Sequence, residues 1–146
     1  MYHYVESGLP YVYLADGFRI EASPYGETVA VQDVDDLHRT IGRWIVDRVP
    51  HLRGREVRFL RLEMDRTQAE LAAELGITEQ TVSLWERGAD KPVPASADRL
   101  LRLIFDAAQD EGQTLAGAMV RIREASGRAP VERQPFRRRE HWSAAA

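Results

Sequence analysis

The chain has 146 residues, enough for one domain or for one domain with a small accessory unit. Hydrophobic residues make up 44% of it and charged residues 29%, and no run approaches the roughly 20 apolar residues of a membrane span. It contains no cysteine, which excludes disulfides, thiolate zinc sites and cysteine nucleophiles. The N-terminus lacks a signal-peptide pattern, so we expect a cytoplasmic protein that makes no contact with a membrane.

The net charge of −3 hides an uneven distribution along the chain. Residues 1–50 contain four arginines and eight acidic side chains, whereas residues 93–146 contain nine arginines and seven acidic side chains. The acidic first third is therefore expected to face a protein rather than DNA. Arginine suits bidentate contacts with phosphate and guanine, although a GC-rich genome also enriches it.

Residues 1–50 are predicted to form a small α+β unit with the order βββα. The strand-like runs are residues 11–14, 18–21 and 28–31. The Asp16-Gly17 pair is a hairpin signal between the first two runs. A helix from Asp33 to about Arg48 carries an apolar stripe, and it must cover one face of the sheet because so small a meander is marginal by itself.

A boundary is expected at residues 50–54, before an all-α domain spanning residues 53–126. Pro50 disfavours continuing the preceding helix, and Gly54 is interpreted as loosening the chain. The helices of this domain are predicted at residues 55–64, 68–75, 79–87, 96–108 and 113–125.

The stretch 67–88, TQAELAAELGITEQTVSLWERG, predicts two short helices joined by a tight turn. Thr67 and Thr78 are hydroxyl residues suited to the N-cap position of each helix. Gly76 permits the positive φ that the turn needs, and the small Ala72 lets the helices cross closely. The pattern is typical of a helix-turn-helix.

The second helix of this motif leaves a polar surface outside at its N-terminal end. A glutamine there can pair with adenine N6 and N7, a glutamate can accept from cytosine N4, and threonine or leucine methyl groups can touch a thymine methyl. The expected DNA-binding residues, including neighbours on the first helix and the following loop, are Gln68, Thr78, Glu79, Gln80, Thr81, Ser83, Leu84, Arg87 and Lys91. The alternative is a helical hairpin whose polar face is only solvated.

On these residues, the segment from Val57 to about Ala107 resembles the helix-turn-helix domain of the XRE (Cro/cI-like) family, a five-helix, lambda-repressor-like DNA-binding module. The resemblance implies that Gln68 bonds the DNA backbone and braces the recognition helix. It also implies a buried ion pair between Arg61 and Glu86. Arg66 departs from the family pattern, because that position is usually apolar.

The helix at residues 96–108 is apolar on two sides and therefore needs two neighbours. One side, extended by the last helix, is predicted to form a homodimer interface. Its residues are Leu101, Phe105, Ala108, Leu115 and Met119. Two alternatives stay open: the last helix folds back over that face within one subunit, or the edge of the N-terminal sheet forms the dimer.

Residues 127–146 are interpreted as a basic C-terminal tail, with the run Arg137-Arg138-Arg139 touching phosphates. The aromatic residues Phe136 and Trp142 favour an alternative, a short strand that docks onto the N-terminal sheet.

The order of parts resembles that of MqsA (YgiT)-type antitoxins, in which an N-terminal unit holds zinc and grips a ribonuclease toxin while a C-terminal unit dimerises and represses the operon. The missing cysteines exclude that zinc site here. No cofactor, metal site or catalytic residue is expected, since the aspartates at positions 33, 35 and 36 fit helix capping and the histidines lack metal-ligand spacing.

The expected function is therefore a transcriptional repressor that binds a palindromic operator in double-stranded DNA as a homodimer. The main alternative is an antitoxin whose N-terminal unit neutralises a toxin protein. A small-molecule sensor that uses the aromatic N-terminal sheet is a third hypothesis.

Overall fold

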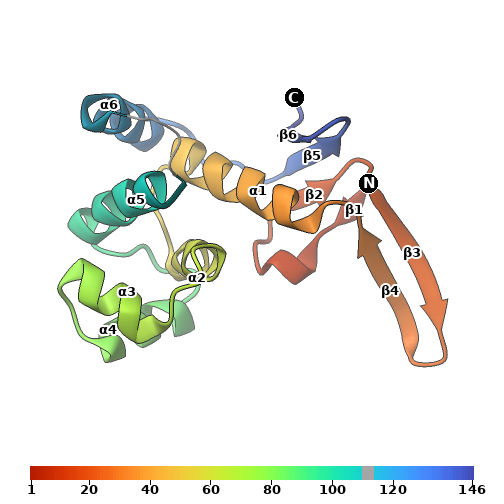
Figure 1. Ribbon diagram of the computed structural model, residues 1–146, viewed down its shortest axis with the longest axis horizontal. Coiled ribbons are helices and arrows are strands. Elements are labelled where there is room, and N and C mark those ends of the chain that lie inside the picture. Colours follow the sequence, from red (N-terminus) through yellow and green to blue (C-terminus); the bar gives the residue numbers. More distant parts are fainter. Residues whose placement is uncertain (110–113) are drawn as a thin grey trace. The chain divides into compact units, whose positions relative to one another are not determined.

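The computed structural model describes residues 1–109 and 114–146, and its architecture is α+β, as the sequence predicts (Figure 1). The strands are β1 (Tyr2–His3), β2 (Val12–Leu14), β3 (Phe18–Ser23), β4 (Gly26–Val31), β5 (Gln134–Arg138) and β6 (Trp142–Ala144). The helices are α1 (Val34–Arg48), α2 (Gly54–Glu63), α3 (Gln68–Leu75), α4 (Glu79–Arg87), α5 (Ala95–Gln109) and α6 (Leu115–Ser126). Gln113, where the last helix was expected to begin, lies outside the described residues.

The chain forms two compact units, one made of residues 1–41 and 131–146 and the other of residues 42–130. The division between the units falls inside α1, between residues 41 and 42, and not at Pro50. The first half of α1 therefore belongs to unit 1 and the second half to unit 2. Among the described residues, no helix is long and apolar enough to cross a membrane.

A four-stranded sheet with the order β1-β2-β5-β6 is the centre of unit 1. The C-terminal strand β5 runs parallel to β2, with Leu14 opposite Phe136, and β6 pairs antiparallel with β5. Phe136 is fully buried and Trp142 is 4% exposed. The sequence 134–144 is therefore part of the sheet rather than a free basic arm, because its two aromatic side chains gain more by burial than by remaining in water.

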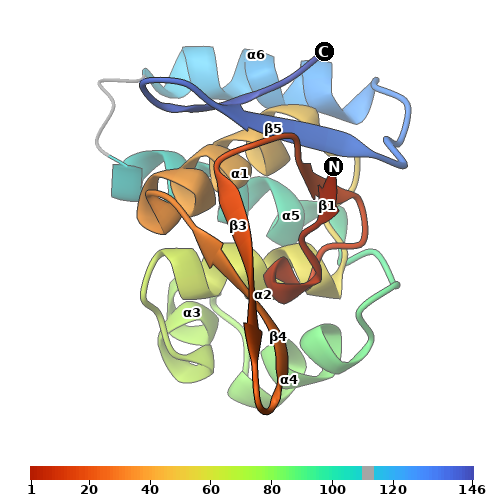
Figure 2. The same cartoon turned by 90° about the vertical axis from the view of Figure 1, so that its right-hand side faces the viewer.

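The strands β3 and β4 form a separate two-stranded hairpin that extends away from this sheet, a narrow ribbon with its turn at the free end (Figures 1 and 2). The predicted three-stranded meander is therefore wrong, because β2 has β1 and β5 as neighbours and never pairs with β3. Gly17 has a positive φ of 72°, but it serves close packing: a Cβ there would lie 2.7 Å from the Trp142 ring.

The first half of α1 packs within unit 1 through its apolar stripe, with Leu37 and Ile41 fully buried. His38 lies beside them, and its Nε2 is 2.8 Å from the Tyr4 hydroxyl. The Trp142 ring nitrogen donates to the carbonyl of Gln32 over 2.8 Å. These contacts hold the helix start, the hairpin base and the C-terminal strand together.

In unit 2, α2 begins directly against the end of α4. The backbone N–H of Gly54 donates to the Lys91 carbonyl over 3.2 Å, and that of Arg55 donates to the Ala89 carbonyl over 3.2 Å. The interpretation of Gly54 as a loosening residue is wrong, since its missing side chain is what allows this contact.

A buried arginine on α5 holds the C-terminal end of α1. Arg102 is 1% exposed, and it donates to the carbonyl groups of Val46 and Val49 over 2.9 and 2.7 Å. Its charge is balanced by Asp98 at 2.6 Å, and Asp98 also accepts from the Leu52 N–H. A cation at a helix C-terminus satisfies carbonyls that have no partner within the helix.

Candidate nucleic-acid interface

The ends of α3 and α4 have the capping geometry that their sequence predicts. The Thr67 hydroxyl accepts from the Glu70 N–H over 3.0 Å, and the Glu70 carboxylate accepts from the Thr67 N–H, which closes a capping box. Gly76 takes a left-handed conformation with φ of 70° between the helices. Thr78 then caps α4 by accepting from the Thr81 N–H over 3.2 Å.

The carboxylate of Glu86 on α4 joins three helices. Arg61 of α2 donates to it twice, from Nε over 2.7 Å and from Nη2 over 2.8 Å. Gln68, the first residue of α3, donates from its amide over 3.3 Å. The Glu86 side chain is 5% exposed and that of Arg61 is 11% exposed, so this pair is largely withdrawn from water.

Gln68 retains hydrogen-bonding groups beyond those that it uses in this cluster. One amide donor is used inside the protein, and the half-buried side chain still has an acceptor oxygen and a second N–H. Because Glu86 belongs to α4, Gln68 links the start of α3 to the rear of the helix that presents the outward polar surface.

That outward surface is concentrated at the N-terminal end of α4. Thr78, Glu79 and Gln80 are exposed, and Leu84 one turn later is 60% exposed. Thr81 and Ser83 are half-buried, and the Thr81 hydroxyl lies 2.8 Å from that of Thr78. Among the expected base-reading residues, Glu79, Gln80 and Leu84 are therefore exposed, whereas the Thr78 and Thr81 hydroxyls bond each other at the N-cap of α4.

Cationic side chains lie at the C-terminal end of α4, in the loop after it and on α2. Arg87 and Lys91 are exposed at the end of α4 and in the following loop, whose backbone is held by a bond from the Lys91 N–H to the Gly88 carbonyl. Arg58 of α2, which the sequence analysis did not single out, is 59% exposed and has its Nε 4.0 Å from Glu86. Arg58 stands one helical turn before Arg61, and that spacing was the signal available in the sequence.

Residues 57–104 match the helix-turn-helix family model. The matched segment is a helix-turn-helix domain. It covers about a third of the chain, runs from α2 into α5, and supports the function of a DNA-binding transcriptional regulator. None of the curated proteins and none of the solved structures matches the chain.

Arg66, the residue that departs from the XRE pattern, precedes α3 of the helix-turn-helix domain. Its Nε pairs with Glu74 over 2.6 Å, and its backbone carbonyl accepts from Arg61 over 2.9 Å. The guanidinium is therefore held on the outside of α3 by a partly exposed ion pair.

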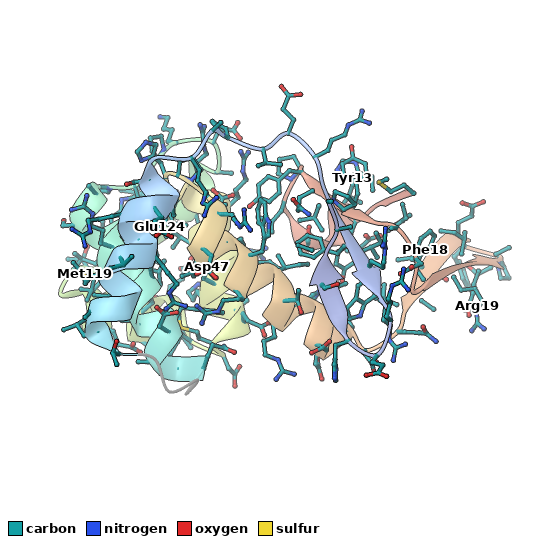
Figure 3. The ribbon with its side chains drawn as sticks, turned by 90° about the horizontal axis from the view of Figure 1, so that it is seen from above. Tyr13, Phe18, Arg19, Asp47, Met119 and Glu124 are labelled. Atoms are coloured by element: carbon teal, nitrogen blue, oxygen red, sulfur yellow. The ribbon has the colours of Figure 1, made fainter. Side chains whose placement is uncertain are left out.

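The expected dimer interface needs correction. Leu101 is 1% exposed and Phe105 is fully buried, because this side of α5 faces the core of unit 2. A Cβ at Gly42 of α1 would lie 2.7 Å from the Phe105 ring, which shows how closely the two helices pack. Ala108 is exposed at the end of α5. On α6, Leu115 is 68% exposed and Met119 is 39% exposed. Figure 3 labels Met119 on this helix.

A charged cluster, which the sequence analysis missed, joins α6 to the rest of unit 2. Asp106 of α5 accepts from Arg43 of α1 over 2.5 Å and from Arg121 of α6 over 3.0 Å. Asp47 lies among these groups, 3.6 Å from Arg43, and burial raises its pKa (Figure 3). Arg43 lies 63 residues before Asp106 in the chain, so no local spacing predicts their meeting.

Proposed function

We propose that the protein is a sequence-specific transcriptional repressor whose α4 reads base edges in the DNA major groove. The observation that supports this most is that one face of α4 is fixed by hydrogen bonds to other helices, while the opposite face, here called the front, is exposed. Glu86 on the rear is bonded to Arg61 and Gln68, whereas Glu79, Gln80 and Leu84 on the front are exposed. A helix held rigidly from behind can present side chains to base edges without losing much conformational freedom on binding.

The chemistry of the front matches base recognition. Gln80 carries an amide that can pair with adenine, Glu79 can accept from cytosine N4, and Leu84 can contact a thymine methyl. Gln68, Arg87 and Lys91 would bond phosphates and set the register of the domain on the duplex. Arg58 is a further candidate for such a phosphate contact, because its exposed guanidinium lies near the same carboxylate as Gln68.

We propose that binding takes place as a homodimer on a palindromic operator. A single recognition helix reads few base pairs, and twofold dimers place two such helices on half-sites about one DNA turn apart. Leu101 and Phe105 are buried in the core, so among the five residues first assigned to this interface Ala108, Leu115 and Met119 are the exposed ones.

The direct test is selection of DNA by the full chain from a random duplex library. The proposal expects an enriched inverted repeat with half-sites roughly 10 base pairs apart, bound at least a thousandfold more tightly than random DNA at the same salt concentration. Enrichment of no sequence, with binding that depends on salt alone, would contradict sequence-specific repression.

An antitoxin of the MqsA-like layout is the second candidate, in which unit 1 neutralises a toxin while the helix-turn-helix domain regulates the operon. Unit 1 is a separate compact fold and residues 1–50 are acidic. Within the described part of the chain, no strand covers the outer edges of the hairpin. Such edges can add a strand from a partner. The test is growth: a small basic protein encoded beside this chain should be toxic alone and harmless when the two are produced together.

A further inference from the structure

The outer edge of β3 in the hairpin of unit 1 has no neighbouring strand among the described residues. The hairpin is a two-stranded sheet of its own, and its side chains are mostly exposed, with Tyr25 at the turn 100% exposed. Isolated two-stranded hairpins are marginally stable in water, and a free edge with alternating apolar residues is a template for another strand.

The backbone of β3 offers its free hydrogen-bonding groups at even-numbered residues. Gln32 donates to the carbonyl of Gly17, which stands opposite it, so residue 17 points its backbone groups toward β4. Because the backbone N–H and C=O groups alternate in direction along a strand, those of residues 19, 21 and 23 also point toward β4. The groups of Phe18, Ile20 and Ala22 therefore point to the free edge.

The side-chain pattern of β3 is complementary to that of a second β3 strand placed antiparallel beside it. Phe18, Ile20 and Ala22 lie on one face of the hairpin, with Val31, Val29 and Glu27 opposite them on β4. This face is mainly apolar, and its one charged residue, Glu27, belongs to β4. Arg19 and Glu21 share the other face, on either side of Ile20, and their charged groups are 2.6 Å apart. A basic and an acidic residue placed symmetrically about a centre is the pattern that a twofold strand pair needs.

We propose that β3 pairs antiparallel with β3 of a second copy of this chain, centred on Ile20. In this register Ile20 faces its own equivalent, Phe18 faces Ala22 of the copy, and Arg19 faces Glu21 of the copy. The even-numbered residues then form the hydrogen-bonded pairs, as the free backbone groups require. Arg19 and Glu21 occupy the closer, non-hydrogen-bonded pair, where charges interact most strongly.

The neighbouring registers are disfavoured by charge. A shift that keeps the backbone bonds moves the centre by one residue and brings Arg19 opposite its own equivalent, or Glu21 opposite its own equivalent. The other edge offers no such match, because β4 contains Glu27 and no basic residue. The pairing yields a four-stranded sheet from two hairpins, in which one face is mainly apolar apart from Glu27 and the other carries Arg19 and Glu21.

This pairing would form the interface of the dimer in the proposed function. It rests on the proposed function only for the existence of a dimer. It is tested on the full chain without DNA, so its failure is separate from a failure of DNA binding. The wild-type chain should sediment as a dimer at micromolar concentration, and a wild-type monomer there would overturn the proposal whatever its DNA binding.

The decisive experiment uses Arg19→Glu and Glu21→Arg in two separate chains. Both residues are exposed, so each variant should keep the wild-type melting temperature. Each alone faces like charges in its own dimer and should dimerise at least about tenfold more weakly. An equimolar mixture should recover a mixed dimer near wild-type affinity, because every facing pair is then opposite in charge.

The mixture distinguishes contacts between chains from effects within one chain. Each variant keeps two like charges at positions 19 and 21 of its own strand whether or not the two are mixed, so only a contact between chains can change on mixing. Recovery supports β3–β3 pairing, whereas variants that dimerise like wild type, or a mixture no better than its components, would overturn it. The register is checked by Ile20→Cys, which should form a disulfide-linked dimer on mild oxidation. The chain has no native cysteine, and Thr28→Cys on β4 is the control that should remain uncrosslinked.

Discussion

Gly54 and Trp85 touch through their backbones: a Cβ added to Gly54 would lie 1.8 Å from the carbonyl oxygen of Trp85. This contact sets the start of α2 against the end of α4, and it therefore positions the helix that is proposed to read DNA. A flexible side chain could rotate away from such a contact, but two backbones can separate only if both helices move.

Gly54→Ala is expected to lower the free energy of unfolding of unit 2 by about 3 kcal/mol or more, because the added methyl group meets backbone. Thermal melting of the full chain measures this. The matched control is Gly127→Ala, where the nearest atom to an added Cβ is at 3.7 Å, and it should melt like wild type. An unchanged melting temperature for Gly54→Ala would show that α2 starts elsewhere.

Glu86→Gln should destabilise the fold by about 3–5 kcal/mol, because it leaves the buried Arg61 without its counter-charge. The comparison is Glu74→Gln, which breaks the partly exposed pair with Arg66 and should cost less than about 1 kcal/mol. Urea denaturation of both variants gives the two values. Equal and small losses would place the Arg61–Glu86 pair at the solvent-exposed surface.

Phe105→Glu should unfold unit 2 rather than separate a folded dimer, since Phe105 is fully buried beside Gly42. Burying an unpaired carboxylate costs several kcal/mol. Met119→Glu on the exposed side of α6 should stay folded and keep its oligomeric state. Circular dichroism and light scattering distinguish these outcomes, and a folded monomeric Phe105→Glu chain would restore α5 as the interface.

Unit 1 should lose stability as the pH falls below about 6.5, the usual pKa of histidine. Burial lowers the pKa of His38, whose Nε2 lies 2.8 Å from the Tyr4 hydroxyl. The unfolded chain therefore takes up this proton at a higher pH than the folded chain, and the stability contributed by neutral His38 is lost as the pH drops toward its lowered pKa. His38→Gln should flatten the melting temperature between pH 5 and 7, whereas His141→Gln at an exposed position should not. A slope unchanged by His38→Gln would rule His38 out as its source.

The sequence predicts α3 and α4 to the residue because their determinants are local. Thr67, Gly76 and Thr78 act on backbone groups within three or four residues of themselves, so their spacing is sufficient information. Arg61 and Glu86 are 25 residues apart, and only the family resemblance brought them together in advance.

The errors concern contacts between distant segments. The Asp16-Gly17 pair was taken as a hairpin signal, but β2 and β3 do not pair, and the missing side chain of Gly17 makes room for Trp142. One of the two strands that β2 pairs with is β5, in which Gln134, opposite Val12, lies 122 residues later in the chain. The face of α5 that carries Leu101 and Phe105 was assigned to a dimer interface, but both side chains are buried in unit 2, because an apolar stripe does not reveal which neighbour covers it.

The central claim is that the exposed front of α4 reads base sequence, and the selected operator tests it through Gln80→Ala. Loss of a base-reading amide should weaken binding to the operator by about 1–3 kcal/mol, relax preference at one position of each half-site, and leave binding to random DNA unchanged. Lys91→Ala should instead weaken binding to all sequences alike and reduce its salt dependence. Unaltered affinity and base preference for Gln80→Ala would contradict the assignment of this residue to base recognition.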